Sequence, residues 1–456
     1  MRQAVLLFPD GPRGVSLVGH RVAGLNLLDR QIRTLARAGM EHVSVLLPKE
    51  ATPNLTPITQ KLPVQVEFVT RGNHPTLPDP EAPYLLLLGE YVHHHSSLSA
   101  WVSHLRTASS LVALSTPHPQ QKGLLHRANR QFDETEDRTD LVSSGAFCCH
   151  PSVFPPAHLS EKEQPWNLLA EQSTDDIHFD VSERTLWRRV DQPGGVRQVK
   201  NMLFGQVTKT TSGFISRHIN ARLSIPTSKL LVETGLSPHA ITVLLVLTTG
   251  LYSAYLVSMA RDYSTLLIGG ILWQLAAVFD RCDGEVARVK LCESKFGAWF
   301  DTVTDNFAYL CGYLGTLVGM IRIHEGESLY AYIGISSIAA MFVTLFVMYS
   351  YAKKTGSGSL QDYLRALTLE VDEAEKSWVQ KLMERYGFVA KRDFFSFYVF
   401  IACAANQLAL VYWFLVTVLH VTAAAVLLSR PAMTRSYKKS ARTSPPSTTS
   451  EADRVR

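Results

Sequence analysis

The chain has 456 residues, of which 46% are hydrophobic and 19% charged, and its formal net charge is +5. The length predicts two or more domains, and so modest a charge does not indicate nucleic acid as a partner. The six cysteines include no CxxC pair, which argues against a disulfide or zinc framework. The first apolar stretch is too short for a signal peptide.

The first half of the chain alternates strand-like and helical patterns. We expect strands at 4–8, 42–47, 64–69, 84–88 and 111–115, a turn at 9–14, and a helix at 22–38 closed by Gly39. This alternation predicts an α/β domain with a parallel-rich sheet. His93, His94 and His95 are consecutive and cannot all face one ion from a strand, so a polar loop is expected there.

The order of these elements resembles the nucleotidyltransferase fold of sugar-nucleotide and inositol-phosphate cytidylyltransferases. The resemblance rests on Ala23, Gly24, Leu25, Leu28, Arg30, Ala38, Gly39 and the run 85–89. The turn is shorter than that family's Gly-rich loop, no Lys occurs before Lys49, and Glu90 stands where the family has a metal-binding Asp. We therefore expect residues 1–195 to lack nucleotidyltransferase activity; an active domain is the alternative.

A linker follows at 191–195, where the sequence Asp-Gln-Pro-Gly-Gly breaks the pattern. Within the next segment, 196–236, basic and apolar residues interleave from Val199 to Leu223. This pattern predicts a juxtamembrane amphipathic helix at an anionic membrane surface, with a soluble interdomain helix as the alternative.

The remainder predicts an all-α domain of six transmembrane helices at 237–430. The expected spans are 237–259, 264–282, 297–321, 329–352, 392–407 and 409–429. The last two are separated near Asn406 because the apolar run 394–428 would overrun a hydrocarbon core of about 30 Å. Lys and Arg concentrate in alternate loops, which predicts that both termini are cytoplasmic. The tail 431–456 is basic and is expected to be disordered.

Four carboxylates recur at helical intervals where two of these spans meet. Asp280 and Asp283 are three residues apart, and Asp301 and Asp305 are four apart, so each pair shares a helix face. Ionised carboxylates at membrane depth require compensation. All-oxygen ligands indicate Mg²⁺ or Mn²⁺, with Ca²⁺ as a further candidate, and two ions about 3.5–4 Å apart would suit phosphoryl transfer.

The spacing D-x2-D-G-x2-A-R-x8-G-x3-D-x3-D looks like the signature of the CDP-alcohol phosphatidyltransferase family. All eight signature positions match: Asp280, Asp283, Gly284, Ala287, Arg288, Gly297, Asp301 and Asp305. Gly284 and Gly297 would let a nucleotide approach closely, and Arg288 could reach a phosphate oxygen. The charge pattern places the signature on the cytoplasmic side.

The resemblance implies an integral membrane transferase that moves an alcohol phosphate from a CDP-alcohol to an acceptor and releases CMP. By the same resemblance the four Asp hold the metals, Asp305 is the base, and Thr242 joins the CDP-binding set of Gly284, Ala287, Arg288 and Gly297. His239 replaces the family's Asn near Thr242. Lys353 and Arg392 are candidates for the acceptor's phosphate; interfacial snorkelling is the alternative.

Two substrate classes and one non-enzymatic function are consistent with the sequence. Diacylglycerol-linked substrates would make this a phospholipid biosynthesis enzyme, while the fused N-terminal domain is similar to bifunctional enzymes that make CDP-inositol and join it to inositol phosphate. A transporter is the non-enzymatic alternative. We expect contact with membrane lipids, a homodimer, and a plasma or inner membrane location in a prokaryote.

Overall fold

The computed structural model describes residues 2–104, 111–117, 141–152, 154–161, 177–181, 186–208, 213–355 and 392–443. The chain divides into two compact units. The α/β unit comprises Met1–Val207, Lys229–Gly235 and Glu285–Cys292, and the helical unit comprises Thr208–Ser228, Leu236–Gly284 and Glu293–Arg456. One helix, α12, contributes residues to both units because the division falls after Gly284.

The α/β unit is built on a seven-stranded sheet in the order β10-β8-β9-β6-β1-β4-β5. Its strands are β1 (Gln3–Leu7), β4 (His42–Leu47), β5 (Gln65–Thr70), β6 (Tyr84–Leu88), β8 (Leu111–Pro117), β9 (Leu141–Cys149) and β10 (Ile177–Val181). The central strand β1 is buried throughout and pairs in parallel with β4 and β6, whereas β9 runs antiparallel to both neighbours. A strand covered on both faces is largely apolar, as residues 4–7 of β1 are. The predicted parallel-rich sheet is confirmed.

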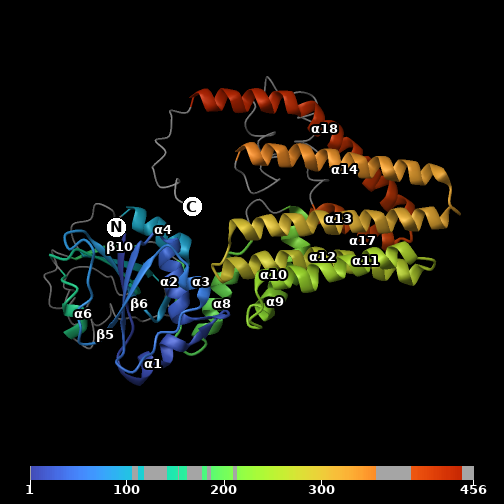
Figure 1. The fold of residues 1–456 in the computed structure, drawn as a ribbon. Helices are drawn as coiled ribbons and strands as arrows, with labels where there is room; N and C mark the ends of the chain where they lie inside the picture. The colour runs from blue at the N-terminus through green and yellow to red at the C-terminus, as the bar shows by residue number, and fades with distance from the viewer. Residues whose placement is uncertain are drawn as a thin grey trace. The chain divides into compact units, whose positions relative to one another are not determined.

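Helices and short strands flank this sheet (Figure 1). They are α1 (Gly11–Gly19), β2 (Arg21–Val22), β3 (Leu25–Asn26), α2 (Leu27–Arg37), α3 (Pro57–Gln60), β7 (Tyr91–His93), α4 (His95–His104), α6 (His158–Glu161), β11 (Trp187–Arg189) and α8 (Gly195–Gly205). The side chain of Asn26 caps α2 by accepting a hydrogen bond from the Asp29 amide at 2.7 Å. Gly39, with φ of 91°, follows the end of α2 as predicted.

Three local predictions in this unit are wrong. The expected turn at 9–14 is the start of α1, because Pro12 suits the first turn of a helix. The helix expected from residue 22 begins at Leu27, because Gly24, with φ of 80°, lies between β2 and β3. His93 is not in a polar loop: it ends strand β7 and is 1% exposed.

Burial of His93 predicts that the α/β unit is sensitive to acid. Burial lowers the pKa of His93 from 6.5 to about 4. Its contribution to stability is complete above pH 6.5 and is lost as the pH falls towards 4, by up to about 3 kcal/mol. We expect His93→Asn to weaken the pH dependence of the melting temperature of the full chain in detergent between pH 7 and 4.5. The same change at exposed His20 should leave that dependence intact; equal slopes for both variants would refute the assignment.

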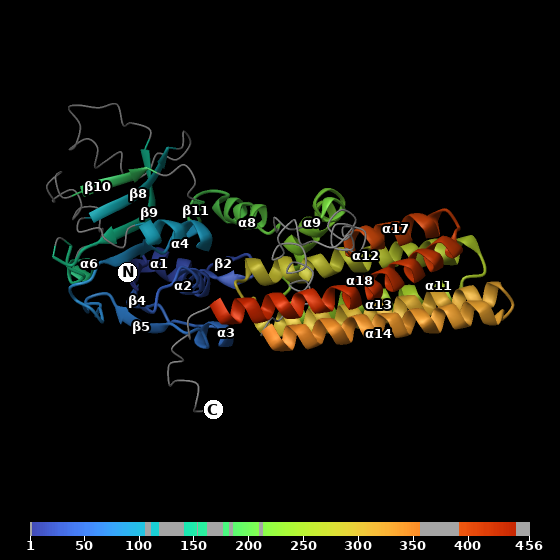
Figure 2. The same cartoon turned by 90° about the horizontal axis from the view of Figure 1, so that it is seen from above.

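In the described residues of the helical unit, the long helical segments run side by side (Figures 1 and 2). The first is formed by α10 (Pro238–Ile241), η3 (Thr242–Leu247) and α11 (Thr248–Met259), and the others are α12 (Tyr263–Val289), α13 (Lys295–Ile323), α14 (Ser328–Thr355), α17 (Arg392–Ala404) and α18 (Leu408–Thr443). Ser237 caps the first segment by accepting from the Ala240 amide at 3.1 Å. Asn406, with φ of 56°, separates α17 from α18 at the predicted break.

Four described helices are long and apolar enough to cross a membrane: Pro238–Met259, Tyr263–Val289, Ser328–Ser350 and Leu408–Leu428. They indicate an integral membrane protein. Asp393–Ala404 is apolar but shorter. Helix α13 lies outside this set, since polar residues such as Asp305 and Asn306 lower its hydropathy. A helix is present at each of the six predicted spans. That all six cross the membrane remains a prediction.

Two predictions at the margins of this unit are wrong in part. The expected juxtamembrane helix is interrupted: α8 ends at Gly205, and the chain becomes helical again in η2 (Ser216–Asn220) and α9 (Ala221–Leu231). The tail expected to be disordered continues α18 as far as Thr443, because its Ala, Met, Arg and Lys residues are good helix formers. Residues 444–456 lie outside the described part of the chain.

Candidate active site

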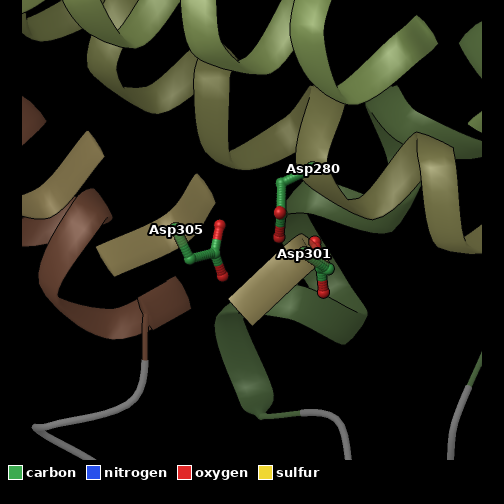
Figure 3. Close-up of side chains that lie close together, drawn as sticks. All are labelled: Asp280, Asp301 and Asp305. Atoms are coloured by element: carbon green, nitrogen blue, oxygen red, sulfur yellow. The ribbon is translucent and has the colours of Figure 1, made fainter. Parts of the chain in front are cut away.

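Three of the predicted carboxylates lie together in the helical unit. Asp280 comes from α12, and Asp301 and Asp305 come from α13. One oxygen from each lies within 4.8 Å of the others, and all three residues are partly buried. Figure 3 shows the three side chains close together. The helical spacing of Asp301 and Asp305 places both on the face of α13 from which they meet Asp280.

This cluster fits a hard divalent cation. Ligands on opposite sides of octahedral Mg²⁺ are separated by about 4.1 Å, and those around Ca²⁺ by about 5 Å, since the ion–oxygen distances are half these values. Three carboxylate oxygens within 4.8 Å of one another can therefore share one such ion after a small shift of their side chains. An all-oxygen set disfavours zinc, which prefers nitrogen and sulfur ligands.

Asp283 belongs to a neighbouring arrangement and is not one of these three. It is 6% exposed, and one of its carboxylate oxygens accepts a hydrogen bond from the Thr242 hydroxyl at 2.5 Å. The same hydroxyl oxygen lies 3.1 Å from the Pro238 carbonyl oxygen. The structure thus brings together two residues that the sequence assigned separately, one to metal binding and the other to CDP binding.

The close approach of α13 to α11 helps to place the acidic pair of α13. A Cβ on Gly315 would lie 2.3 Å from the carbonyl oxygen of Ala254, so a larger residue would push these helices apart. Such small-residue contacts are typical of helices packed inside membranes. Gly315 was not singled out in the sequence, because glycine has many uses in membrane helices.

The remaining predicted binding residues occupy helix ends. Gly284 precedes the last turn of α12, which carries Ala287 and Arg288. The amide of Gly297 donates to Ser294, the cap of α13, at 2.9 Å. A Cβ on Gly297 would lie 3.3 Å from His239 Cε1. His239, which replaces the family's Asn near Thr242, therefore lies beside Gly297 of the signature.

Lys353 and Arg392 both lie at helix ends. Lys353 is in the last turns of α14, and Arg392 is the first residue of α17. Their side chains fall outside the described ones, so their predicted contact with an acceptor stays a prediction.

Two anchoring residues were missed in the sequence. The guanidinium of Arg281, next to Asp280, donates to hydroxyls in the juxtamembrane segment: Ser224 at 2.9 Å, Ser216 at 2.7 Å and Thr208 at 2.8 Å. A carboxylate oxygen of Asp393 accepts from the Ser216 amide at 3.0 Å. These bonds tie the juxtamembrane segment to α12 and α17. Their partners lie 57 to 177 residues apart in the chain, so no local pattern could reveal them.

The candidate nucleotide site of the α/β unit is organised by ion pairs. Arg13, which belongs to the expected turn and lies in the first turn of α1, forms an ion pair with Asp191. Asp191 also accepts two bonds from Arg189, at 2.7 and 3.0 Å. Burial, with a smaller contribution from Asp191, raises the pKa of Glu90. Arg13, the cation of the segment expected to bind phosphate, is therefore paired with Asp191 of its own chain.

Comparison with known proteins assigns the helical domain. Residues 236–368 match the family model described as CDP-alcohol phosphatidyltransferase. This range contains all eight signature positions and Thr242.

Relatives of known description share a single name. A "Bifunctional IPC transferase and DIPP synthase" of Rubrobacter xylanophilus is 27% identical over 359 residues, which cover 73% of this chain and 78% of that protein. A protein of the same name from Thermococcus kodakarensis is 30% identical over 189 residues, or 41% of this chain and 42% of that protein.

The solved structure of the inositol-1-phosphate CTP transferase from T. maritima matches with a TM-score of 0.29 and 13% identity. That match covers 44% of this chain and 96% of the other. With a TM-score of 0.29, this match does not assign the α/β unit. The assignment therefore depends on the helical domain: the chain carries a C-terminal domain of the CDP-alcohol phosphatidyltransferase family.

Proposed function

We propose that this membrane protein transfers a substituted phosphate group from a CDP-alcohol to an acceptor hydroxyl in a metal-dependent reaction that releases CMP. The observation that carries the proposal is the meeting of Asp280, Asp301 and Asp305 within a CDP-alcohol phosphatidyltransferase domain. Isolated carboxylates between apolar helices are costly, so their convergence favours a bound cation.

In this proposal Asp280, Asp301 and Asp305 hold Mg²⁺ or Mn²⁺, and Asp283 is the fourth ligand of a two-metal site. Bound there, such ions would supply the positive charge that stabilises the pyrophosphate and the leaving group. Asp305 accepts the proton of the acceptor hydroxyl. The acceptor oxygen bonds to the β-phosphorus, and the bond from that phosphorus to the bridging oxygen breaks. CMP departs with the electron pair, and the Arg288 guanidinium stabilises its charge.

The remaining predictions about the site complete this proposal. Thr242, Gly284, Ala287 and Gly297 contribute to the CDP site, and Lys353 and Arg392 bind the acceptor's phosphate. The excess of Lys and Arg in alternate loops supports six crossings with both termini and the active site in the cytoplasm. A homodimer remains part of the proposal.

The direct test is CMP release by the purified full chain in lipid vesicles. CDP-diacylglycerol and CDP-inositol would be offered separately, each with inositol phosphate and glycerol phosphate, with Mg²⁺, Mn²⁺ or chelator. We expect release with at least one pair, and only when a divalent ion is present. Failure of every pair, together with substrate-independent ion flux driven by a proton gradient, would favour the transporter alternative.

The relatives support a second, more specific candidate. Their shared name describes two activities, and the Rubrobacter alignment spans 73% of this chain. The corresponding candidate is transfer from CDP-inositol to inositol phosphate, giving a soluble phosphodiester. In the assay above, CDP-inositol would then support faster CMP release than CDP-diacylglycerol, and the reverse order would favour phospholipid synthesis.

We further propose that the α/β unit is not an active cytidylyltransferase. The ion pair between Arg13 and Asp191, and the absence of a lysine before Lys49, support this. We expect no pyrophosphate release from CTP and inositol 1-phosphate above that of a heat-treated sample. Arg13→Ala should leave this background unchanged. Pyrophosphate release by the unaltered chain that is lost in Arg13→Ala would show an active first domain.

A further inference from the structure

Helix α12 ends in a turn whose last carbonyl groups are all hydrogen-bonded. Leu291 adopts φ of 51°, the left-handed conformation that often closes a helix. Three amides close the turn: Lys290 donates to Val286 at 2.9 Å, Leu291 to Arg288 at 3.1 Å and Cys292 to Ala287 at 3.0 Å. The carbonyls of Val289 and Lys290, at the end of this turn, accept hydrogen bonds from another helix of the α/β unit.

Two arginines of α2 donate these hydrogen bonds. Nη1 of Arg30 donates to the Val289 carbonyl at 3.0 Å, and Nη1 of Arg33 donates to the Lys290 carbonyl at 2.6 Å. All four residues belong to the α/β unit, which includes Glu285–Cys292. A cation at the carboxyl end of a helix is favourable, because the exposed carbonyls there carry partial negative charge.

Both guanidinium groups are also fixed on their other side. Arg30 donates to the carbonyls of Val22 at 3.1 and 3.2 Å and Ala23 at 3.1 Å. Arg33 donates to hydroxyl oxygens of Thr59 at 2.9 Å and Thr56 at 2.8 Å. Each arginine thus links the end of α12 to a separate part of the α/β unit.

Because Arg30 and Arg33 are buried, their contacts require the guanidinium group of arginine. Arg30 is 1% and Arg33 2% exposed, and burial lowers the pKa of Arg30 to about 10. A buried cation is tolerated only where its donors are satisfied. Lysine has one nitrogen and cannot bridge the same set of acceptors. Arg30 was part of the resemblance to nucleotidyltransferases, yet its contacts here are backbone carbonyls rather than a nucleotide site.

The turn held by these arginines carries Arg288, the signature arginine. The same continuous helix carries Asp280 and Asp283 further back. We propose that Arg30 and Arg33 are positioning residues for the transfer reaction, which fix the last turn of α12 so that Arg288 is held ready for CDP-alcohol. This role rests on the proposed function. It gives the α/β unit a structural function that does not depend on cytidylyltransferase activity.

The test combines hydrogen exchange with kinetics on the full chain in lipid nanodiscs. We expect Arg33→Met to speed amide exchange in the peptide covering 285–292 by at least about tenfold, because a charged hydrogen bond is lost. The KM for CDP-alcohol should rise by about tenfold, while the Mg²⁺ concentration for half-maximal activity stays unchanged. Arg33→Lys should recover part of both effects. Arg37→Lys, an exposed change on the same helix, is the control.

Thr59→Val provides a second variant if Arg33→Met does not fold, because it frees one side of Arg33 and keeps the charge. It should shift exchange and KM in the same direction by a smaller factor. Faster exchange with an unchanged KM would show that the contact is merely structural. Unchanged exchange would show that Arg33 does not hold the last turn of α12. Either result overturns the proposal. If the unaltered chain releases no CMP, the proposed function fails by itself, and with it the kinetic role; the exchange data would still show whether the arginines hold the turn.

Discussion

Asp301→Asn is expected to reduce CMP release by at least about 10³-fold, because it removes a charged ligand from the acidic cluster. Asp301 is one of three residues whose carboxylate oxygens lie within 4.8 Å of one another, so its loss leaves Asp280, Asp305 and the neighbouring Asp283 to hold the cations. Metal stabilisation of the transition state amounts to several kcal/mol, and each 1.36 kcal/mol corresponds to about tenfold in rate. The measurement is CMP release per mole of chain in vesicles at saturating Mg²⁺.

The control for this variant is Glu327→Gln, which removes one negative charge from an exposed position after α13. It should retain full activity, and both variants should elute as the unaltered chain does in size-exclusion chromatography. Activity of Asp301→Asn within tenfold of the control would remove this residue from the metal site. Excess Mn²⁺ should not rescue the variant, because an amide oxygen is a poor replacement for a carboxylate.

Thr242→Val should slow turnover by about 10- to 150-fold without abolishing it. The Thr242 hydroxyl donates to the buried Asp283 carboxylate at 2.5 Å, and valine has the same shape but no donor. A hydrogen bond to a charged group contributes about 1.5–3 kcal/mol, which corresponds to this range. The misplaced carboxylate should also raise the Mg²⁺ concentration needed for half-maximal activity.

Thr242→Ser is the matched comparison, since it restores the hydroxyl and removes only a methyl group. Its activity should lie close to that of the unaltered chain. If serine and valine were equally impaired, packing of the methyl group rather than the hydrogen bond would explain the loss. If neither were impaired, Asp283 would not depend on Thr242 for its position.

The periodic features of this protein could be predicted from the sequence. Strands β4 and β6 have the predicted limits, because apolar runs bounded by turns define them. The acidic pairs could be recognised because i, i+3 and i, i+4 spacings fix a common helix face. The meeting of Asp280 with Asp301 and Asp305 followed from the short segment between α12 and α13.

The features that depend on distant partners could not be predicted. Arg33 was not singled out in the sequence, and Arg30 was noted only for the resemblance to nucleotidyltransferases. Their acceptors at Val289 and Lys290 lie over 250 residues away. Thr242 was assigned to CDP by resemblance, and its bond to Asp283 appears only when η3 and α12 are packed. The start of α1 was missed because glycine and proline together signal a turn as readily as the first turn of a helix.

The central claim is that the carboxylate cluster holds divalent metal, and Mn²⁺ binding tests it without knowledge of the substrate. Free Mn²⁺ would be followed by electron paramagnetic resonance during titration of the purified full chain and of Asp301→Asn. We predict saturable binding of one or two Mn²⁺ per chain, displaced by Mg²⁺ and lost in the variant. Equal binding by both proteins, or none by the unaltered chain, would contradict the account.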